Sequence, residues 1–520
     1  MPDAGPAGTD SRRIVAWART AAGSRALVVL VAAGTGLSAL VALSTARIQS
    51  RGARALLGEW GNATGSLASW LPAPRDFRGL LVAAVLGLTA CWVAVAALVA
   101  ARKTRPRWAA AAAAAWAAPF ALLPPVLSRD AYAYLAQGEV LRRGLDAYQV
   151  PVAALGRHSL VLSATDPLWR HSIPPYGALA LRLAEGATAL GGSTPVVGLV
   201  ALRLLALAAV VAAAWACVAL VRPRPAGLTL WLAAASPLAL LHLVGGMHWE
   251  ALTCALVAGA LLLARRGRRL AALLPAVLAT ELKVTAAVVV LALLVDTLRV
   301  RGWLAGARHA LVAAVLGLAL PLLAGLDPFG WARGLATPAA VWNPLTPSTT
   351  LAMAALESLE HLGAGPVPHL LGTLRALSSV AAAVVALVVL ATTGRRELTA
   401  TVGLLLADVA LLGPVLWPWY LVPAALFLSV SADPPWRRLG VGLTCASVLF
   451  TLPLGVVVMQ RYAVADEVAV LAVVLVLSGR FRRRGRGPEP ALSLAGAPGR
   501  EGAGSRVLVH DGHVPGGPDV

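Results

Sequence analysis

Charged residues are scarce in this sequence, and their scarcity excludes most classes of soluble protein. Of the 520 residues, 13% are charged and 58% are hydrophobic, whereas an average soluble domain is about one quarter charged. A soluble enzyme is therefore excluded, and so is a chain that is disordered over most of its length. The composition is that of a protein that crosses a membrane many times.

Lysine is nearly absent as well. It occurs only at Lys103 and Lys283, so arginine carries most of the net charge of +20. The arginines lie in short clusters between apolar runs, which is typical of membrane topology. We find no basic face or reading motif and expect no nucleic-acid partner. The four cysteines lie singly inside apolar runs, without the spacing of a zinc site or a disulfide framework.

The sequence also lacks the motifs of common catalytic and cofactor sites. It contains no P-loop, no GxGxxG after a strand, no HExxH and no nucleophile elbow. We therefore expect no cytoplasmic nucleotide site, and an activated substrate should arrive through the membrane. No cofactor is predicted, and the use of a metal stays open. His248 and Glu250 alone offer too few ligands for zinc; they are either satisfied turn residues or part of a substrate site.

What the sequence does contain is a series of apolar runs that can cross a bilayer, for which a helix needs about 20 residues. Ten runs are clear spans and four are shorter and ambiguous. The clear spans are 26–45, 79–101, 108–127, 196–221, 227–245, 309–325, 368–392, 399–416, 439–459 and 462–478, and the shorter segments are 249–264, 270–282, 284–298 and 419–432. They predict an all-α polytopic membrane protein with about 11–14 transmembrane helices.

The arginine clusters predict the orientation of these spans. They fall at every second junction, and because basic loops stay in the cytoplasm, both chain ends are placed there. We predict a cytoplasmic N-terminal segment over 1–25, a membrane domain over 26–479, and a disordered, basic cytoplasmic tail over 480–520.

Two long loops, 128–176 and 326–367, then lie outside the cell membrane. They contain most of the Asp, His, Trp and Pro residues that topology does not explain. We therefore expect the chemistry on the extracytoplasmic face of the plasma membrane. The segment 177–191 is apolar but carries Arg182 and Glu185, and a crossing there would reverse the next basic turn. We predict that it forms a short helix along the outer interface.

Acidic and aromatic residues open the first outer loop. It begins Ser-Arg-Asp-Ala-Tyr-Ala-Tyr-Leu-Ala-Gln-Gly, and Asp146 and Tyr148 follow. In a helix, Tyr134 lies one turn beyond Asp130 on the same face. Asp130 either caps that helix or acts as a general base that takes a proton from a sugar hydroxyl. Asp146 and Asp166 are the reserve carboxylates for this role.

Further aromatic residues mark the remainder of the outer face. Asp166 and Trp169 belong to an Asp-Pro-Leu-Trp run, and Tyr176 follows two prolines. Aromatic side chains at a membrane edge commonly form an interfacial belt, but their faces also pack against the C–H faces of a sugar. Irregular stretches that contain both Trp and Pro, at 342–349 and 414–420, indicate re-entrant or rim structure at other outer ends.

Three cations lie near the outer ends of apolar segments, namely Lys283, Arg203 and Arg375. A cation inside a membrane span is costly enough to indicate a function. We predict that these residues contact a lipid phosphate. For Lys283 the alternatives are an ion pair with Glu281 and snorkelling toward the interface.

Taken together, these motifs resemble those of the polyprenol-phosphomannose-dependent α-1,6-mannosyltransferases. That family consists of bacterial membrane glycosyltransferases of the GT-C architecture, and it is associated with lipomannan-type glycolipids. The resemblance lies in Ser-Arg-Asp-x-Tyr-x-Tyr-x-x-Gln-Gly, Gly-Leu-Asp-x-Tyr, Asp-Pro-Leu-Trp, Pro-Tyr-Gly, Gly-Met-His-Trp-Glu, Lys-Val-Thr and Pro-Trp-Tyr, and it extends over about 80–478. The chain departs from the family pattern at Ala147, Trp249 and Ala178, where the family tends to have Pro, a small polar residue and Pro.

The resemblance implies transfer of mannose from a polyprenyl-phosphate-linked donor to a glycolipid or glycan acceptor on the outer face, with an α-1,6 linkage. An α product from a β-linked donor implies inversion, with a base on the acceptor and a stabilised phosphate leaving group. On this basis Asp130 is the predicted catalytic base. The predicted substrate-binding residues are Tyr134, Asp146, Tyr148, Asp166, Trp169, Tyr176, His248, Glu250, Lys283, Arg203 and Arg375.

Other functions stay open at this point. The chain could be a GT-C enzyme that uses another polyprenyl-phosphate sugar, a transporter or flippase of lipid-linked sugars, or a membrane scaffold without catalysis. A transporter would show helices broken at mid-membrane and paired halves. Here the polar residues gather in the outer loops and at their edges, which favours the transferase.

Overall fold

The structure, a computed structural model, describes residues 15–71, 78–221, 225–337, 341–343, 345–363 and 367–449. Within these ranges the regular secondary structure is entirely helical, which confirms the predicted all-α polytopic membrane fold. The described residues all belong to one compact unit of the chain. The predicted tail over 480–520 and the predicted span 462–478 lie outside the described residues.

Five helices in the described part of the chain are long and apolar enough to span a membrane. They are α2 (Ala21–Arg47), α5 (Arg78–Arg102), α11 (Pro195–Leu220), α16 (Trp303–Leu323) and α20 (Leu370–Ala391). The helices α5, α11 and α16 are apolar around their whole circumference and not along one stripe. This pattern is expected where lipid or other apolar helices surround a helix on every side.

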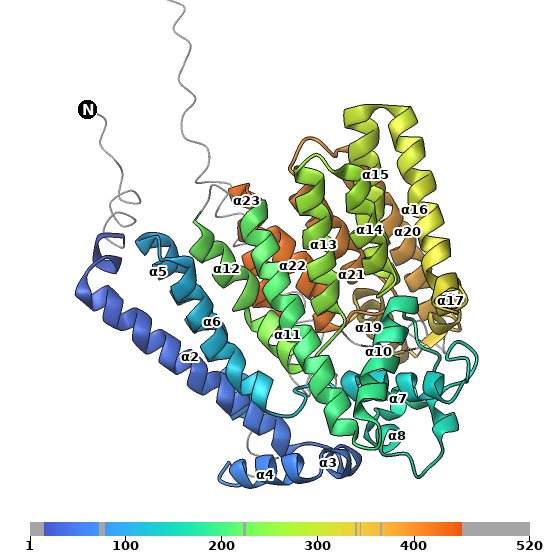
Figure 1. Ribbon diagram of the computed structural model, residues 1–520, viewed down its shortest axis with the longest axis horizontal. Helices are drawn as coiled ribbons and strands as arrows, with labels where there is room; N and C mark the ends of the chain where they lie inside the picture. Colours follow the sequence, from blue (N-terminus) through green and yellow to red (C-terminus); the bar gives the residue numbers. More distant parts are fainter. Residues whose placement is uncertain are drawn as a thin grey trace, which may run out of the picture. The chain divides into compact units, whose positions relative to one another are not determined.

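Shorter helices complete the bundle (Figure 1). They are α6 (Pro106–Leu122), α12 (Ala226–Ala234), η2 (Ala239–Gly245), α13 (Glu250–Arg265), α14 (Arg269–Thr280), η3 (Val284–Ala286), α15 (Ala287–Arg301), α21 (Leu398–Leu412), α22 (Leu421–Ser429) and α23 (Pro434–Leu449). The predicted span 227–245 is broken, because α12 and η2 meet at an angle of 62°. Pro237 lies at the break and lacks the N–H that a continuous helix would use.

Three buried tryptophans connect the N-terminal helices to α12. The indole N–H of Trp116 donates to the Val31 carbonyl oxygen at 2.9 Å, and that of Trp231 donates to the Trp92 carbonyl oxygen at 3.1 Å. The rings of Trp116 and Trp231 meet edge to face with centroids 4.9 Å apart. A Cβ on Gly34 of α2 would overlap the Trp116 ring, so a glycine is needed there. These contacts fix α2, whose last turn reaches the candidate site.

The two predicted outer loops come together at one end of the bundle, the lower end in Figure 1. This end contains α3 (Arg51–Leu57), α4 (Glu59–Leu67), α7 (Asp130–Arg142), η1 (Val152–Leu155), α8 (Leu160–Ala164), α10 (Ala178–Gly191), α17 (Trp331–Gly334) and α19 (Pro347–His361). The loops touch through glycines: a Cβ on Gly330 would overlap the Tyr148 ring, and one on Gly334 would lie 2.5 Å from the Pro174 carbonyl oxygen. The segment predicted as an interfacial helix, 177–191, is α10.

Candidate active site

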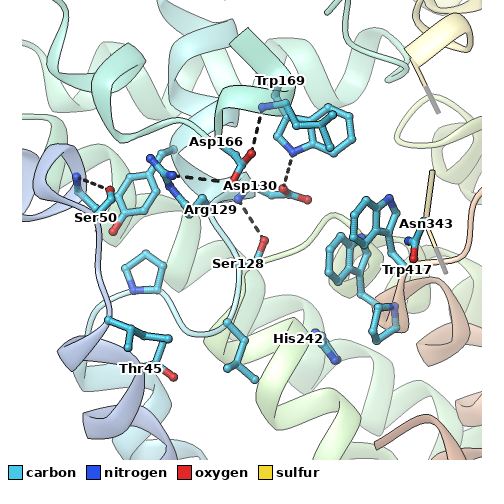
Figure 2. A pocket seen from close by; sticks show the side chains of 18 of the residues that line it. Thr45, Ser50, Ser128, Arg129, Asp130, Asp166, Trp169, His242, Asn343 and Trp417 are labelled. Atoms are coloured by element: carbon cyan, nitrogen blue, oxygen red, sulfur yellow. Dashed lines mark hydrogen bonds and ion pairs between the residues drawn. The ribbon is translucent and has the colours of Figure 1, made fainter. Parts of the chain in front are cut away.

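A cavity of about 490 Å³ lies where the two predicted outer loops meet (Figure 2). Its walls come from the junction of α2 and α3, the chain entering α7, the helix α9 (Pro167–Arg170), the residues Val341 to Asn343 with Leu345, and η4 (Pro418–Tyr420). The volume is within the usual range for a small-molecule site, about 300–1,000 Å³. The lining includes two carboxylates and four indole rings, those of Asp130, Asp166, Trp169, Trp342, Trp417 and Trp419.

Asp130 is the first residue of α7, and its carboxylate faces the cavity. Its Oδ1 accepts a hydrogen bond of 3.1 Å from the Trp169 indole N–H, and the residue is only 6% exposed. The capping role that the sequence left open is not found. Arg129 is the N-cap of α7 and makes no capping hydrogen bond through its side chain. The Asp130 backbone N–H instead donates to Ser128 Oγ at 3.1 Å. The Asp130 carboxylate therefore has another role than closing the helix.

The Asp130 carboxylate is one member of a closed ring of side-chain contacts. His248 Nδ1 lies 3.3 Å from Asp130 Oδ2, and the imidazole stacks on Trp419 with centroids 4.0 Å apart. Trp419 stacks on Trp417 at 5.2 Å, and Trp417 meets Trp169 edge to face at 6.4 Å. Because Trp169 also donates to Asp130, the five side chains form a closed circuit, which we call the carboxylate cluster.

Arg129 connects the α8–α9 segment to the start of α7. Its guanidinium donates to the carbonyl oxygens of Ala164 and Thr165 at 2.9 and 3.1 Å, and it lies 3.7 Å from Asp166 Oδ2. Burial lowers the pKa of Arg129, although the nearby Asp166 opposes that shift. Asp166 itself caps α9 by accepting the Leu168 backbone N–H at 3.0 Å. This network holds α9, and with it Trp169, against Asp130.

The other predicted residues of the first loop lie outside the cavity lining. Asp146 accepts hydrogen bonds of 2.8 Å from the Tyr148 backbone N–H and from the Gln149 side chain, so it closes a turn. Tyr148 donates to the Tyr176 carbonyl oxygen at 2.9 Å, and Tyr134 meets the Tyr176 ring edge to face. Burial raises the pKa of all three tyrosines, so their hydroxyls remain protonated at neutral pH.

Lys283 and Glu250 form a second charged cluster, which we call the lysine cluster. The two side chains make an ion pair, and Lys283 Nζ lies 3.2 Å from the centre of the Tyr420 ring. Both charged residues are buried, and the space beside them measures about 20 Å³, roughly the room for one water molecule. Glu281, the partner considered from the sequence, instead accepts the Ala178 backbone N–H at 3.2 Å.

Arg203 and Arg375 lie behind the residues that line the cavity. Arg203 on α11 is 4% exposed and donates through Nη2 to the Gly245 carbonyl oxygen at 3.4 Å. Its Nε and Nη1 make no hydrogen bond to any described residue. Tyr132, which lines the cavity, is close enough for an electrostatic interaction with Arg203. Arg375 on α20 donates to the carbonyl oxygen of Val341, another lining residue.

Some lining residues carried no signal in the sequence. Thr45, Gln49 and Ser50 come from the junction of α2 and α3, which reads as the ordinary end of a span. Asn343 belongs to a stretch predicted as rim structure, and its amide donates to the Leu416 carbonyl oxygen at 2.8 Å, which ties two walls together. Within the ranges that the structure describes, no three His, Cys, Asp or Glu side chains are grouped so as to hold a metal ion.

Comparison with known protein families covers both halves of the chain. Residues 20–299 match the family described as alpha-(1->6)-mannopyranosyltransferase, N-terminal domain. Residues 348–481 match the family described as MptB C-terminal domain. The first match contains Asp130, His248 and Lys283, so both the carboxylate cluster and the lysine cluster draw on it.

Curated relatives agree with these family matches. A probable alpha-(1->6)-mannopyranosyltransferase of Mycolicibacterium smegmatis is 29% identical over 425 residues, which cover 72% of this chain and 75% of the relative. An alpha-(1->6)-mannopyranosyltransferase of Mycobacterium tuberculosis is 30% identical over 436 residues, covering 70% and 72%. Alpha-(1->6)-mannopyranosyltransferase B of Corynebacterium glutamicum is 28% identical over 375 residues, covering 66% and 62%. No solved structure matches this chain significantly.

Proposed function

This chain belongs to the alpha-(1->6)-mannopyranosyltransferase family, and from that premise we propose that the cavity beside Asp130 uses a polyprenyl-phosphate-linked mannose as donor. The family membership makes the protein a membrane glycosyltransferase that acts on a sugar donor and a glycan acceptor and forms an α-1,6 linkage. The proposal adds the lipid carrier of the donor, a glycolipid or glycan acceptor, the extracytoplasmic face of the cell membrane, and a role for each residue.

Asp130 is the proposed general base. The acceptor hydroxyl gives its proton to an Asp130 carboxylate oxygen while the hydroxyl oxygen attacks the anomeric carbon of mannose. The bond from that carbon to the phosphate oxygen breaks, and polyprenyl phosphate leaves with the electron pair. From a β-linked donor, this single displacement gives the α linkage. The proposal depends on one observation: Asp130 is a buried carboxylate that lines a cavity of substrate size.

Arg203 is the proposed partner of the donor phosphate. The leaving phosphate gains negative charge during the reaction, and a guanidinium stabilises that charge through paired hydrogen bonds. Arg203 has two nitrogens without partners among the described residues, and the nearby Tyr132 hydroxyl also lacks one. Lys283, by contrast, is already neutralised by Glu250. We therefore place the phosphate at Arg203 and Tyr132 rather than at Lys283.

Replacement of Asp130 by Asn is the test of this proposal. Asn keeps the size of the side chain but does not accept a proton, so transfer of radiolabelled mannose from polyprenyl phosphomannose should fall by about 10²–10⁴-fold. Donor binding and protein level in the membrane should stay normal. Asp146→Asn is the matched control, because Asp146 lies in the same loop outside the cavity lining. Normal transfer by Asp130→Asn would move the role to Asp166.

The same radiolabel assay distinguishes transfer from transport, a function that the bent helix pair α12–η2 brings into consideration. Transporters use such broken helices at their substrate sites, and η2 supplies His242 to the cavity lining. A transferase moves the label to the acceptor, whereas a flippase moves the intact labelled lipid across the bilayer. Label that crosses sealed vesicles without reaching an acceptor would support transport and contradict the proposed function.

The outer-face assignment has a separate test. We expect a cysteine in place of exposed His158, in the first outer loop, to react with an impermeant thiol reagent added outside intact cells. A cysteine in place of exposed Arg266, at the opposite, basic end of α13, should not react. A variant without the four native cysteines supplies the background. The reverse labelling pattern would place the cavity in the cytoplasm and overturn the use of an outward-facing lipid donor.

A further inference from the structure

We propose that His248 is a positioning residue that holds the Asp130 carboxylate in place for proton transfer, an inference that rests on the function proposed above. The His248 side chain is fully buried, and the residue does not belong to the cavity lining. Its effect on the reaction passes through Asp130, whose Oδ2 lies 3.3 Å from the imidazole Nδ1.

The turn that carries His248 is built around its imidazole ring. Met247 has a φ of +55°, a left-handed conformation that is unfavourable for a residue with a side chain. Gly246 lies directly against the ring, since an added Cβ would be 2.7 Å from Cδ2 and 2.8 Å from Nε2 of His248. The His248 backbone N–H donates to the His242 carbonyl oxygen at 3.2 Å. Together these features fold the chain back and leave the imidazole one position.

Trp419 packs against a face of the imidazole. The two rings are nearly parallel, at 13°, with centroids 4.0 Å apart. Neither ring nitrogen of His248 makes a hydrogen bond within the described structure, so the imidazole acts on Asp130 by contact and polarity. The Trp169 indole N–H holds the other carboxylate oxygen at 3.1 Å. Each Asp130 oxygen thus has its own rigid neighbour, which restricts rotation of the carboxylate.

Three substitutions at His248 separate positioning from general packing. The Asn amide reaches the place of Nδ1, beside Asp130, whereas the Gln amide reaches the place of Nε2, which is directed elsewhere. We expect His248→Ala and His248→Gln to lower kcat about tenfold to a hundredfold, because a shift of about 1 Å in a reacting group costs up to that much. The donor KM should stay unchanged. His248→Asn should restore most of the lost kcat.

A fourth variant moves the imidazole without changing it. The methyl group of Gly246→Ala would overlap the His248 ring and would lie 3.0 Å from the His242 carbonyl oxygen. We therefore expect kcat to fall while the donor KM stays unchanged. Addition of His248→Asn to that variant should raise kcat again, because the smaller side chain relieves the overlap. Gly259→Ala on α13 is the matched control, since a Cβ there meets nothing within 4 Å.

The outcomes distinguish this inference from the proposed function. Equal losses in the Asn and Gln variants, at matched protein level and thermal stability, would overturn the positioning role, and so would a loss confined to the donor KM. Full activity of His248→Ala beside an inactive Asp130→Asn would overturn only the role of His248. Full activity of Asp130→Asn would remove the base itself. If the Ala variant does not accumulate, the Asn and Gln pair decides.

Discussion

One short turn serves two buried clusters that differ in what lies beside them. His248 reaches the carboxylate cluster at a cavity of about 490 Å³, whereas Glu250, two residues later, pairs with Lys283 beside a space of about 20 Å³. Both clusters enclose a carboxylate with aromatic rings. The difference is access, because only the Asp130 carboxylate adjoins room for a sugar. We therefore assign chemistry to the carboxylate cluster and structural stability to the lysine cluster.

The contrast follows from where α13 begins. Glu250 is the first residue of that helix, so its side chain is set by the helix, while His248 still belongs to the preceding turn. Trp249, between them, stacks on Tyr134 of α7 at 4.7 Å. His248 thereby reaches Asp130, whereas Glu250 reaches Lys283. This shows that nearness in the sequence is a poor guide to a shared role.

Removal of Lys283 should produce the largest effect on stability. Lys283→Met leaves Glu250 buried without its partner, and loss of one member of a buried ion pair costs about 3–5 kcal/mol of unfolding free energy. Thermal unfolding in detergent measures the change. The double variant with Glu250→Gln should recover most of it, because no unpaired charge remains buried. A stable Lys283→Met protein with a raised donor KM would return Lys283 to the phosphate site.

Removal of Arg203 should act on the donor instead. Loss of a hydrogen bond to a charged group costs about 1.5–3 kcal/mol, so Arg203→Gln should lower kcat/KM for the donor about tenfold to a hundredfold. Arg203→Lys should recover part of this, because it keeps the charge without the paired geometry. Arg375→Gln is the comparison, since Arg375 holds the Val341 carbonyl oxygen of the cavity wall. A larger donor defect in Arg375→Gln would reverse the assignment.

Trp169→Phe should have a smaller effect on turnover. Phe keeps an aromatic ring against Trp417 but removes the indole N–H that Asp130 Oδ1 accepts. We expect kcat to fall about tenfold, in line with one lost hydrogen bond to a carboxylate. The control is Trp342→Phe, because Trp342 is 52% exposed at the cavity rim. Equal losses in the two variants would mean that indole surface, and not the hydrogen bond to Asp130, determines turnover.

Much of the fold could be predicted from the sequence, because apolar run length sets helix length in a bilayer. The orientation of the spans stays a prediction from the arginine clusters. The broken span 227–245 was less visible. Pro237 signals a possible break, but the 62° bend depends on how α12 and η2 pack. Seven of the residues 177–191 are buried in α10, which helps to explain why an apolar segment with two charges is accommodated there.

The candidate site was predictable only in part. Asp130 and Asp146 look alike in the sequence, both acidic and both followed by a tyrosine after one residue. The structure separates them, because Asp146 is engaged by its own turn and Asp130 is not. The partner of Lys283 lies 33 residues away, a pairing that depends on how helices meet. Long-range contacts of this kind leave no local pattern from which to predict them.

The most direct measurement is to find where the donor binds. A photoreactive analogue of polyprenyl phosphomannose, activated in membranes and mapped by mass spectrometry, reports the residues that adjoin it. We expect the label near Asp130, Trp169 and Trp417, competed by unlabelled donor and retained in Asp130→Asn, whose donor site is intact. Competed label around Lys283 and Glu250, with none at the cavity lining, would contradict the assignment of mannose transfer to the Asp130 cavity.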